Sequence, residues 1–375
     1  MIKAEIVADS VNTIGERITT MLVTFPKIIL AELNTHRAFS RNSASSRAIP
    51  FRKTLKSVVS NPFIPIAFQK DHSGMQGTEY LDVDKVYEFE EIRSILHEFL
   101  SSSFKNEKGE WDEDWLEIDN VLNTHVLPLL ADESNRTIKA WWLKARDLVV
   151  GASCILYAMK VSKQICNRLL EPFMWHTVLI TATEWENFFS LRCPQYNLFH
   201  ENMPLSFRSK KDFLAHVHKV EAPEFKNQYD NLTELDWLYC NKGQSEIHMM
   251  ALAEAMYDAY NESEPKLLQD GEWHIPFEDK IEHRLDFDDY KSFVTYDEFI
   301  ETKVKISTGM NARTSYTVVG EEGKEYSYEA DIKLHDKLLA DLHMSPLEHL
   351  AQAMPGIISR NFKGFKQYRE IVENS

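Results

Sequence analysis

The segment between Pro26 and Pro50 gathers side chains that are suited to binding an anion. After an apolar run comes a polar stretch that begins at Arg37 and ends at Arg47, with no acidic residue between them. Serine hydroxyls and an asparagine amide within it offer short hydrogen-bond donors, while the planar arginine fork matches phosphate oxygens. A solvated loop would also be polar, but it would rarely carry fixed cations without an acid. The residue types therefore predict phosphate or nucleotide binding.

The same segment resembles a family signature. Residues 35–37 followed, after seven residues, by Ser45 resemble the Arg-His-Arg-x7-Ser motif of the flavin-dependent thymidylate synthases. Further matches are Ser40, Asn42 and Arg47. Three positions depart from the family: Thr35 stands for its first arginine, Ser43 for a glutamate and Glu32 for a glutamine. Because the family lines its nucleotide pocket or flavin with these positions, the identity of the substrate stays open.

A second resemblance lies in residues 181–192, which are similar to the family's Asn-Ala-Arg-Ser-Leu-x-Asn-Phe-x-x-Leu-Arg. The matching positions are Asn187, Phe188, Leu191 and Arg192. Thr181 and Thr183 replace an asparagine and an arginine that are associated with the flavin. The resemblance implies that Arg192 stabilises the ionised N3 of a pyrimidine, since a fixed cation favours charge that develops in the transition state. On residue type alone, Arg192 is equally a surface arginine.

Two further motifs lie in the C-terminal part of the sequence. Residues 311–316 resemble the Ala-Arg-x-Ser-Tyr/Phe stretch near the start of family members, and residues 343–349 resemble their His-x-Thr/Ser-Pro-x-Glu-His stretch. In the family both precede the Arg-His-Arg segment, whereas here both follow it. This order implies a circular permutation in which the family's N-terminal block forms residues 300–375, and it predicts that strand 17–25 and the segment after His349 lie side by side.

The resemblance implies an α+β fold with a mixed sheet flanked by helices, and one catalytic domain over residues 1–375. Insertions are expected at about 68–120 and 193–243, where the family motifs are interrupted. In the family the sites form between the subunits of a homotetramer. Arg168, which lies four residues before Pro172, is therefore implied to reach the nucleotide across a subunit boundary.

The implied reaction is methylation of dUMP at C5, with methylenetetrahydrofolate as one-carbon donor and FAD, reduced by NADPH, carrying the redox chemistry. This class needs no protein nucleophile, so Cys193 is interpreted as a structural thiol. The implied catalytic residues are Arg192 and His343. The implied FAD ligands are His36, Arg37, Asn187, Ser315 and Ser345. The implied nucleotide ligands are Glu32, Ser43, Ser45, Ser46, Arg47, Arg168 and Arg192.

Two alternatives stay open. Glu32 is a carboxylate that can accept from the exocyclic amine of cytosine, which uracil lacks, or it can pair with a nearby arginine. The first option favours a flavin- and folate-dependent methylase or hydroxymethylase of dCMP or dUMP. The family's flavin-contacting histidine falls near Lys242, which is a further departure. The departures at Thr35, Ser43, Thr181 and Lys242 are also those of a non-catalytic flavin- or nucleotide-binding protein, whereas the retained arginines favour an enzyme.

Bulk properties argue against other classes. The 375 residues carry a net charge of -16, whereas proteins that bind nucleic-acid polymers present a basic surface. The four cysteines are widely spaced, and His216 and His218 lie beside a lysine, so we expect neither disulfides nor a metal site. No run reaches the roughly 18 apolar residues of a membrane helix. The first ten residues do not resemble a signal peptide, so we expect a cytoplasmic protein.

Hydrophobic patterning predicts the elements that must position these residues. Residues 2–8 and 17–30 are rich in β-branched and aromatic side chains on either side of a polar turn at 12–15, which indicates two strands. Residues 83–150 are predicted to be mainly helical, and residues 244–260 form an amphipathic helix candidate.

Overall fold

The computed structural model describes residues 2–72, 77–105, 109–111, 115–200, 203–220, 228–284, 296–316, 319 and 327–375. The chain forms two compact units, residues 1–63 with 156–375 and residues 64–155. Its fold class is α+β, as the sequence predicted. The insertion expected at about 68–120 falls within the second unit, and the one expected at about 193–243 falls within the first.

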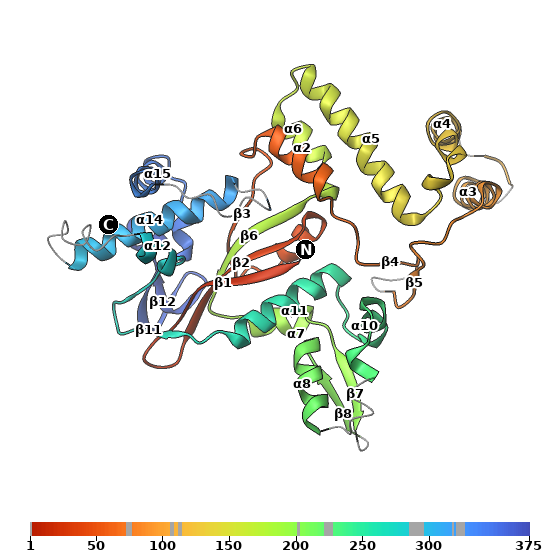
Figure 1. The fold of residues 1–375 in the computed structure, drawn as a ribbon. Coiled ribbons are helices and arrows are strands. Elements are labelled where there is room, and N and C mark those ends of the chain that lie inside the picture. The colour runs from red at the N-terminus through yellow and green to blue at the C-terminus, as the bar shows by residue number, and fades with distance from the viewer. Residues whose placement is uncertain are drawn as a thin grey trace. The chain divides into compact units, whose positions relative to one another are not determined.

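The first unit is built on a five-stranded sheet with the order β3-β6-β2-β1-β9 (Figure 1). Its strands are β1 Lys3–Val11, β2 Arg17–Pro26, β3 Ser40–Ser43, β6 Trp175–Ala182 and β9 Lys266–Leu267. Neighbouring strands are antiparallel except β1 and β9, which are parallel. Asn12 forms the turn between β1 and β2, because its side-chain oxygen accepts from the backbone N–H groups of Ile14 and Glu16.

The two strands that the sequence predicted at the N-terminus are present, but the second is shorter than expected. β2 ends at Pro26, and residues 27–33 form the short helices η1 Lys27–Ile29 and α1 Leu30–Leu33. Proline has no N–H to donate to a strand ladder, so it ends the pairing there. The turn from strand to helix carries the chain away from the sheet just before His36.

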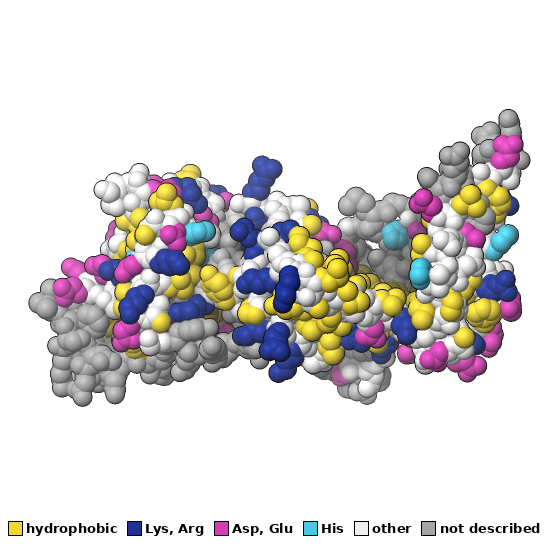
Figure 2. Space-filling view, turned by 90° about the horizontal axis from the view of Figure 1, so that it is seen from above, with side chains coloured by type: hydrophobic (Ala, Val, Ile, Leu, Met, Phe, Trp, Pro, Cys, Tyr) yellow, Lys and Arg dark blue, Asp and Glu magenta, His cyan; other side chains and the backbone are white. Residues whose placement is uncertain are grey.

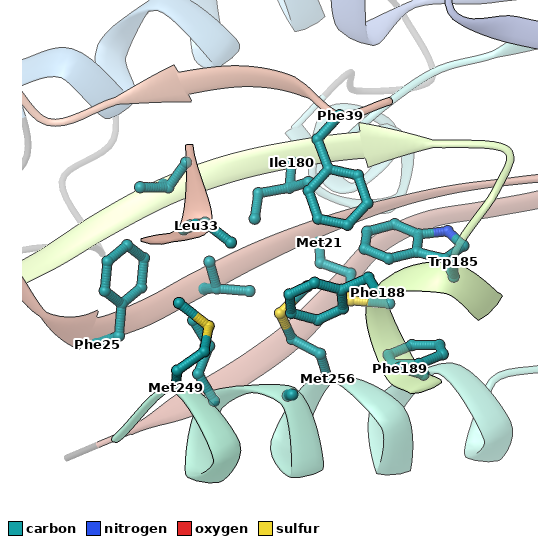
Figure 3. Close-up of a cluster of buried hydrophobic side chains, with 14 of the residues drawn as sticks. Met21, Phe25, Leu33, Phe39, Ile180, Trp185, Phe188, Phe189, Met249 and Met256 are labelled. Atoms are coloured by element: carbon teal, nitrogen blue, oxygen red, sulfur yellow. The ribbon is translucent and has the colours of Figure 1, made fainter. Parts of the chain in front are cut away.

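Helices cover one face of this sheet with an apolar core (Figures 1 and 3). These helices are α7 Glu186–Arg192 and α11 Ile247–Glu262, and the second confirms the helix predicted at 244–260. Met21 and Phe25 of β2 pack with Met249 and Met256 of α11 in one buried cluster. Burying a side chain of this size stabilises the fold by about 1.5–3 kcal/mol. The core therefore fixes α7, which carries Arg192.

The opposite face of the sheet carries a row of buried polar side chains. Buried hydrogen bonds run from Ser10 to His274 (2.9 Å), from His274 to Thr20 (2.8 Å), from Thr20 to Thr181 (2.7 Å) and from Thr181 to His349 (2.8 Å). All five residues are at most 3% exposed. Burial lowers the pKa of His274 to about 4 and that of His349 to about 3, so both imidazoles are neutral at neutral pH. We call these five residues the polar row.

The C-terminal part of the chain packs on the polar row. Its helices are α12 Glu278–Arg284, α14 Tyr296–Arg313, α15 Tyr328–Ala340, α16 Tyr368–Glu373 and the short helices η6 Thr314–Tyr316 and η7 Ser345–His349. Its antiparallel sheet has the order β10-β11-β12, with strands β10 Trp273–His274, β11 Ala351–Ser359 and β12 Phe362–Gln367. Helices α14 and α15 approach closely at Gly309, where a Cβ atom would lie 2.6 Å from the carbonyl oxygen of Asp331.

The contact that the permutation predicted is present. Ile18 of β2 lies in one buried cluster with Ala351 and Ala353 of β11 and with Phe362 and Phe365 of β12. The permutation itself stays a prediction, because this contact concerns packing and not the history of the chain.

A small layer with its own core occupies most of the second expected insertion. Strands β7 Tyr196–His200 and β8 Met203–Phe207 form a hairpin that lies with helices α8 Lys210–Val220 and α10 Glu234–Cys240. Its buried residues are Tyr196, Leu198, Phe213, Val217 and Trp237. Elsewhere in the first unit, α2 Phe51–Ser60 packs against α6 Lys163–Leu169, which is followed by η5 Glu171–Phe173.

The second unit is mainly helical among its described residues, as the sequence predicted for 83–150. Its helices are α3 Phe89–Phe104, α4 Trp115–Val121, most of α5 Ile138–Ala158, and the short η2 Leu122–Val126, η3 Leu127–Ala131 and η4 Glu133–Asn135. Two short strands, β4 Phe68–Gln69 and β5 Tyr80–Leu81, pair antiparallel. Within the described parts of the chain, no helix combines the length and apolar character that crossing a membrane would require.

Candidate functional site

Arg192 is held by three side chains from two other segments. Its Nε donates to Nε2 of His36 at 3.0 Å, and its terminal nitrogens donate to Oγ of Ser245 at 3.2 Å and to Oγ1 of Thr35 at 3.4 Å. Thr35 donates its own proton to the backbone oxygen of Glu32 at 2.7 Å, so its lone pairs face Arg192. The guanidinium at the end of α7 is thereby fixed in one orientation.

The imidazole of His36 is buried and neutral. The residue is 9% exposed, and its ring packs edge-on against Phe188, with centroids 4.9 Å apart, and beside Phe39 at 5.8 Å. Burial, and next the positive charges of Arg192 and Arg41, lower the pKa of His36 to about 4. At neutral pH its Nε2 therefore has a lone pair with which to accept from the guanidinium.

A cavity of about 660 Å³ opens beside this pair. It is lined by residues 35–39, most of residues 183–192, and Tyr260. The predicted site residues among them are His36, Arg37, Asn187 and Arg192. The side chain of Arg37 is exposed at this cavity. Two motifs that are far apart in the sequence thus share one cavity, which we call the Arg192 cavity.

The inner wall of the Arg192 cavity is aromatic. Figure 3 shows Phe39, Trp185 and Phe188 together at one end of the apolar core, and the same residues line the cavity. The indole N–H of Trp185 is buried and has no hydrogen-bond partner among the residues that the structure describes. An aromatic wall beside an exposed arginine suits a planar, anionic ligand.

The N-terminal and C-terminal motifs also meet at β3. The backbone N–H of Ser45 donates to the carbonyl oxygen of Ser315 at 3.0 Å, and Oγ of Ser315 donates to Oδ1 of Asn42 at 3.2 Å. The amide of Asn42 donates to the backbone of Asn311 at 2.5 Å, and the amide of Asn311 donates to the backbone of Pro346 at 3.1 Å. Three motif segments are therefore joined by one set of bonds.

Ser46 lies in a charged cluster that the sequence did not reveal. Lys27 donates to Oε1 of Glu171 at 2.6 Å and to Oγ of Ser46 at 2.7 Å, and the Ser46 hydroxyl also donates to Glu171. Lys27, Glu171 and Arg168 line an open hollow of about 450 Å³. Arg168 is exposed there, so its guanidinium is accessible.

Exposed basic side chains gather around α2 and α6. They are Arg47, Arg52, Lys56, Lys163 and Arg168. Figure 2 looks onto this face and shows Lys and Arg side chains there. Although the chain has a net charge of -16, this local surface is positive and can attract a phosphate. We call it the basic face.

The other predicted residues lie away from the Arg192 cavity. His343 and Ser345 are exposed and do not line it, and Ser43 lies on β3 opposite Val178 of β6. The predicted residues therefore do not share one place: some line the Arg192 cavity, some join β3 to the C-terminal motifs and some lie on the basic face. Glu32, Ser46 and His343 lie outside these three places.

Glu32 has an unusual environment for a carboxylate. Its Oε2 is buried and has no hydrogen-bond partner within the described part of the chain. Glu32 lines neither of the two hollows, but Ala31 lines the one beside Arg168, and Thr35, three residues further on, lines the Arg192 cavity. A buried acceptor without a partner is costly, so an additional hydrogen-bond donor would be favourable there.

Cys193 is placed as a structural thiol rather than a nucleophile. Its sulfur is buried and donates to the backbone oxygen of Ala253 at 3.6 Å, and burial raises the pKa of the thiol. His218 binds Asp230 at 2.7 Å, while the ring of His216 lies beside Phe207. Among the described residues, no group of three or more His, Cys, Asp or Glu side chains could hold a metal ion.

The sequence analysis did not identify several residues of these sites, among them Lys27, Glu171 and Ser245. The pair of Lys27 and Glu171 joins positions that no local spacing rule connects. Ser245 precedes α11. The Ser-Glu pair before this helix predicts where the helix begins, but it does not predict the contact of Ser245 with Arg192.

Comparison of the chain with protein-family models, with curated proteins and with solved structures finds no match.

Proposed function

We propose that the protein methylates dUMP at C5 to give dTMP, with methylenetetrahydrofolate as the one-carbon donor and NADPH as the reductant of bound FAD. The observation that carries this proposal is the meeting of motif residues that are far apart in the sequence. Arg192 bonds to His36 across 156 positions, and Ser315 bonds to Asn42 across 273. Motifs that arose by chance would not be expected to converge in this way.

We also propose that the first unit has the fold of the flavin-dependent thymidylate synthases in permuted order. The packing of Ile18 against Ala351 and Phe365 supports this, because it places the start of the chain beside the segment that follows His349.

The Arg192 cavity offers groups that fit FAD. The exposed Arg37 can pair with its diphosphate, and the Asn187 amide can bond to a polar edge. Bound FAD would supply the redox chemistry that completes the methyl group.

Arg192 would stabilise charge on the pyrimidine. A guanidinium that is already fixed by three hydrogen bonds needs no reorganisation when charge develops on the ring, which is the condition for transition-state stabilisation. Arg47, Arg168 and Ser45 would hold the nucleotide phosphate or sugar on the basic face.

We propose that the complete site forms between the subunits of a homotetramer. Arg168 and Arg192 belong to different hollows of one protomer, and His343, Ser315 and Ser345 lie outside both. Residues that belong to one reaction but are separated in the protomer are brought together when a second copy supplies part of the site.

A second candidate function is favoured by Glu32. Its buried, unpartnered Oε2 is an acceptor, and the exocyclic amine of cytosine would supply the donor that uracil lacks. The candidate is a flavin- and folate-dependent methylase or hydroxymethylase of dCMP.

Mass spectrometry of the nucleotide product tests both functions. Purified protein is examined for flavin absorbance and then supplied with NADPH, methylenetetrahydrofolate and either dUMP or dCMP. A methyl gain on dUMP is expected, and a dCMP or hydroxymethyl product would transfer the assignment to the second candidate. Arg192→Ala should abolish turnover and keep flavin, while Arg93→Ala, on the exposed face of α3, should match the wild type. Bound flavin without any product would leave a non-catalytic binding protein.

A further inference from the structure

We infer that His36 positions Arg192 and does not act as a flavin ligand. Its imidazole is a fixed neutral acceptor for Nε, while Thr35 and Ser245 hold the two terminal nitrogens. The inference deepens the proposed function and rests on the role proposed there for Arg192, because it concerns how that arginine is aimed.

The surroundings of His36 leave its ring little freedom. Phe188 meets the ring at an interplanar angle of 89°, Phe39 lies at 29°, and the two phenyl rings pack on each other at 5.2 Å. The backbone oxygen of His36 accepts from Arg41 at 3.4 Å, which fixes the main chain as well. Since Nε2 accepts from Arg192, the ring proton is assigned to Nδ1. The one acceptor nitrogen of the neutral ring is therefore already engaged by Arg192 and is not left for a flavin.

The three bonds define what Arg192 can still bind. A guanidinium has five N–H groups in a planar fork, and three of them are engaged by His36, Thr35 and Ser245. One N–H remains on each terminal nitrogen. Such a pair matches two adjacent acceptors in one plane, as the carbonyl oxygen and ionised ring nitrogen of a pyrimidine present them.

This geometry also explains a departure from the family pattern. An arginine at position 35 would offer no acceptor to Arg192 and would place a second positive charge beside it. Thr35 instead contributes a hydroxyl oxygen, which is aimed by its own bond to the backbone of Glu32. The replacement is therefore consistent with a retained site and not with loss of one.

Two His36 variants of the flavin-loaded protein separate positioning from flavin binding. In His36→Gln the amide oxygen can still accept from Arg192, whereas in His36→Leu the acceptor is lost and the apolar volume is kept. His97→Leu, at an exposed position of α3, is the matched control. For each protein we would measure flavin absorbance per protomer, dUMP and dCMP affinity by calorimetry, and kcat and KM separately.

We expect His36→Leu to keep its flavin, and to lose nucleotide affinity and about 10- to 100-fold in kcat, because a misplaced catalytic group is costly. His36→Gln should recover most of both, and His97→Leu should be unchanged. Loss of flavin in both His36 variants with intact nucleotide affinity would overturn the inference, as would a fully active His36→Leu.

Thr35→Val and Thr35→Ser give a second test that leaves the aromatic packing intact. The valine variant should raise KM and lower kcat, and the serine variant should not. If the wild type binds neither nucleotide, the proposed function fails, and crystal structures of the His36 variants still decide the positioning role. An Arg192 side chain that stays in place in His36→Leu would overturn it.

Discussion

Gly309→Ala is expected to destabilise the protein although alanine is the better helix former. The added Cβ would lie 2.6 Å from the carbonyl oxygen and 2.8 Å from the Cα of Asp331, and neither backbone atom can move without moving α15. Asp331 is itself buried and paired with Nε of Arg313 at 2.6 Å, so a shift of α15 would strain that ion pair. Overpacking costs about 1–3 kcal/mol, while replacing glycine in a helix gains about 1 kcal/mol. We therefore expect a net loss of up to about 2 kcal/mol.

Scanning calorimetry measures this loss as a lower Tm for the unit that contains α14. Gly151→Ala in α5 is the control, because nothing lies within 4 Å of its added Cβ and the substitution should stabilise α5 by up to about 1 kcal/mol. Gly309→Ala should melt a few degrees below the wild type, and Gly151→Ala should not. A Gly309→Ala protein as stable as the wild type would refute the close approach of α14 and α15.

Three further predictions concern the proposed site and the polar row. Arg168→Ala and Arg192→Ala should each be inactive. When the two variants are unfolded and refolded together, about one quarter of the sites should be active, because each site takes Arg168 and Arg192 from independently chosen subunits. If no activity returns, both residues of a site belong to one protomer. Cys193→Ser should keep turnover, since a buried thiol of raised pKa is not a nucleophile, and an inactive but folded variant would show otherwise. The free energy of unfolding should be highest above about pH 6.5 and should fall as the pH approaches the folded pKa values of His274 and His349, near 4 and 3. The reason is that below about pH 6.5 the unfolded chain binds protons that the folded protein excludes. The free energy of unfolding from urea titrations should therefore fall between about pH 7.5 and 5, by up to about 2 kcal/mol for each histidine, and His274→Gln should flatten the dependence.

Local patterns predicted the elements that carry the site. The first two strands and the helix near 244–260 follow from side-chain periodicity, which reports on which face is buried. The end of β2 at Pro26 was missed because the apolar run continues beyond it, and periodicity cannot distinguish a short buried helix from a strand. The α+β class follows from these elements, whereas the division into two units does not.

Only the motif resemblance predicted contacts between distant segments. The bond of Arg192 to His36 joins two motifs, so the resemblance led to their neighbourhood although not to this bond. Neither a motif nor a residue spacing predicted the cluster of Lys27, Ser46 and Glu171. Such pairs depend on the tertiary fold, which a single sequence does not display.

The polar row fixes how the two sheets of the first unit are aligned with each other. Side chains alternate along a strand, so a slide of one residue along β6 would replace Thr181 by Ile180 or Ala182 opposite His349. An apolar interface would tolerate such a slide, because dispersion contacts are not directional. Here the slide would leave buried imidazole and hydroxyl groups without partners. The alignment of the C-terminal motifs with β3 is therefore encoded in the interface itself, independently of the order in which the chain connects the two sheets.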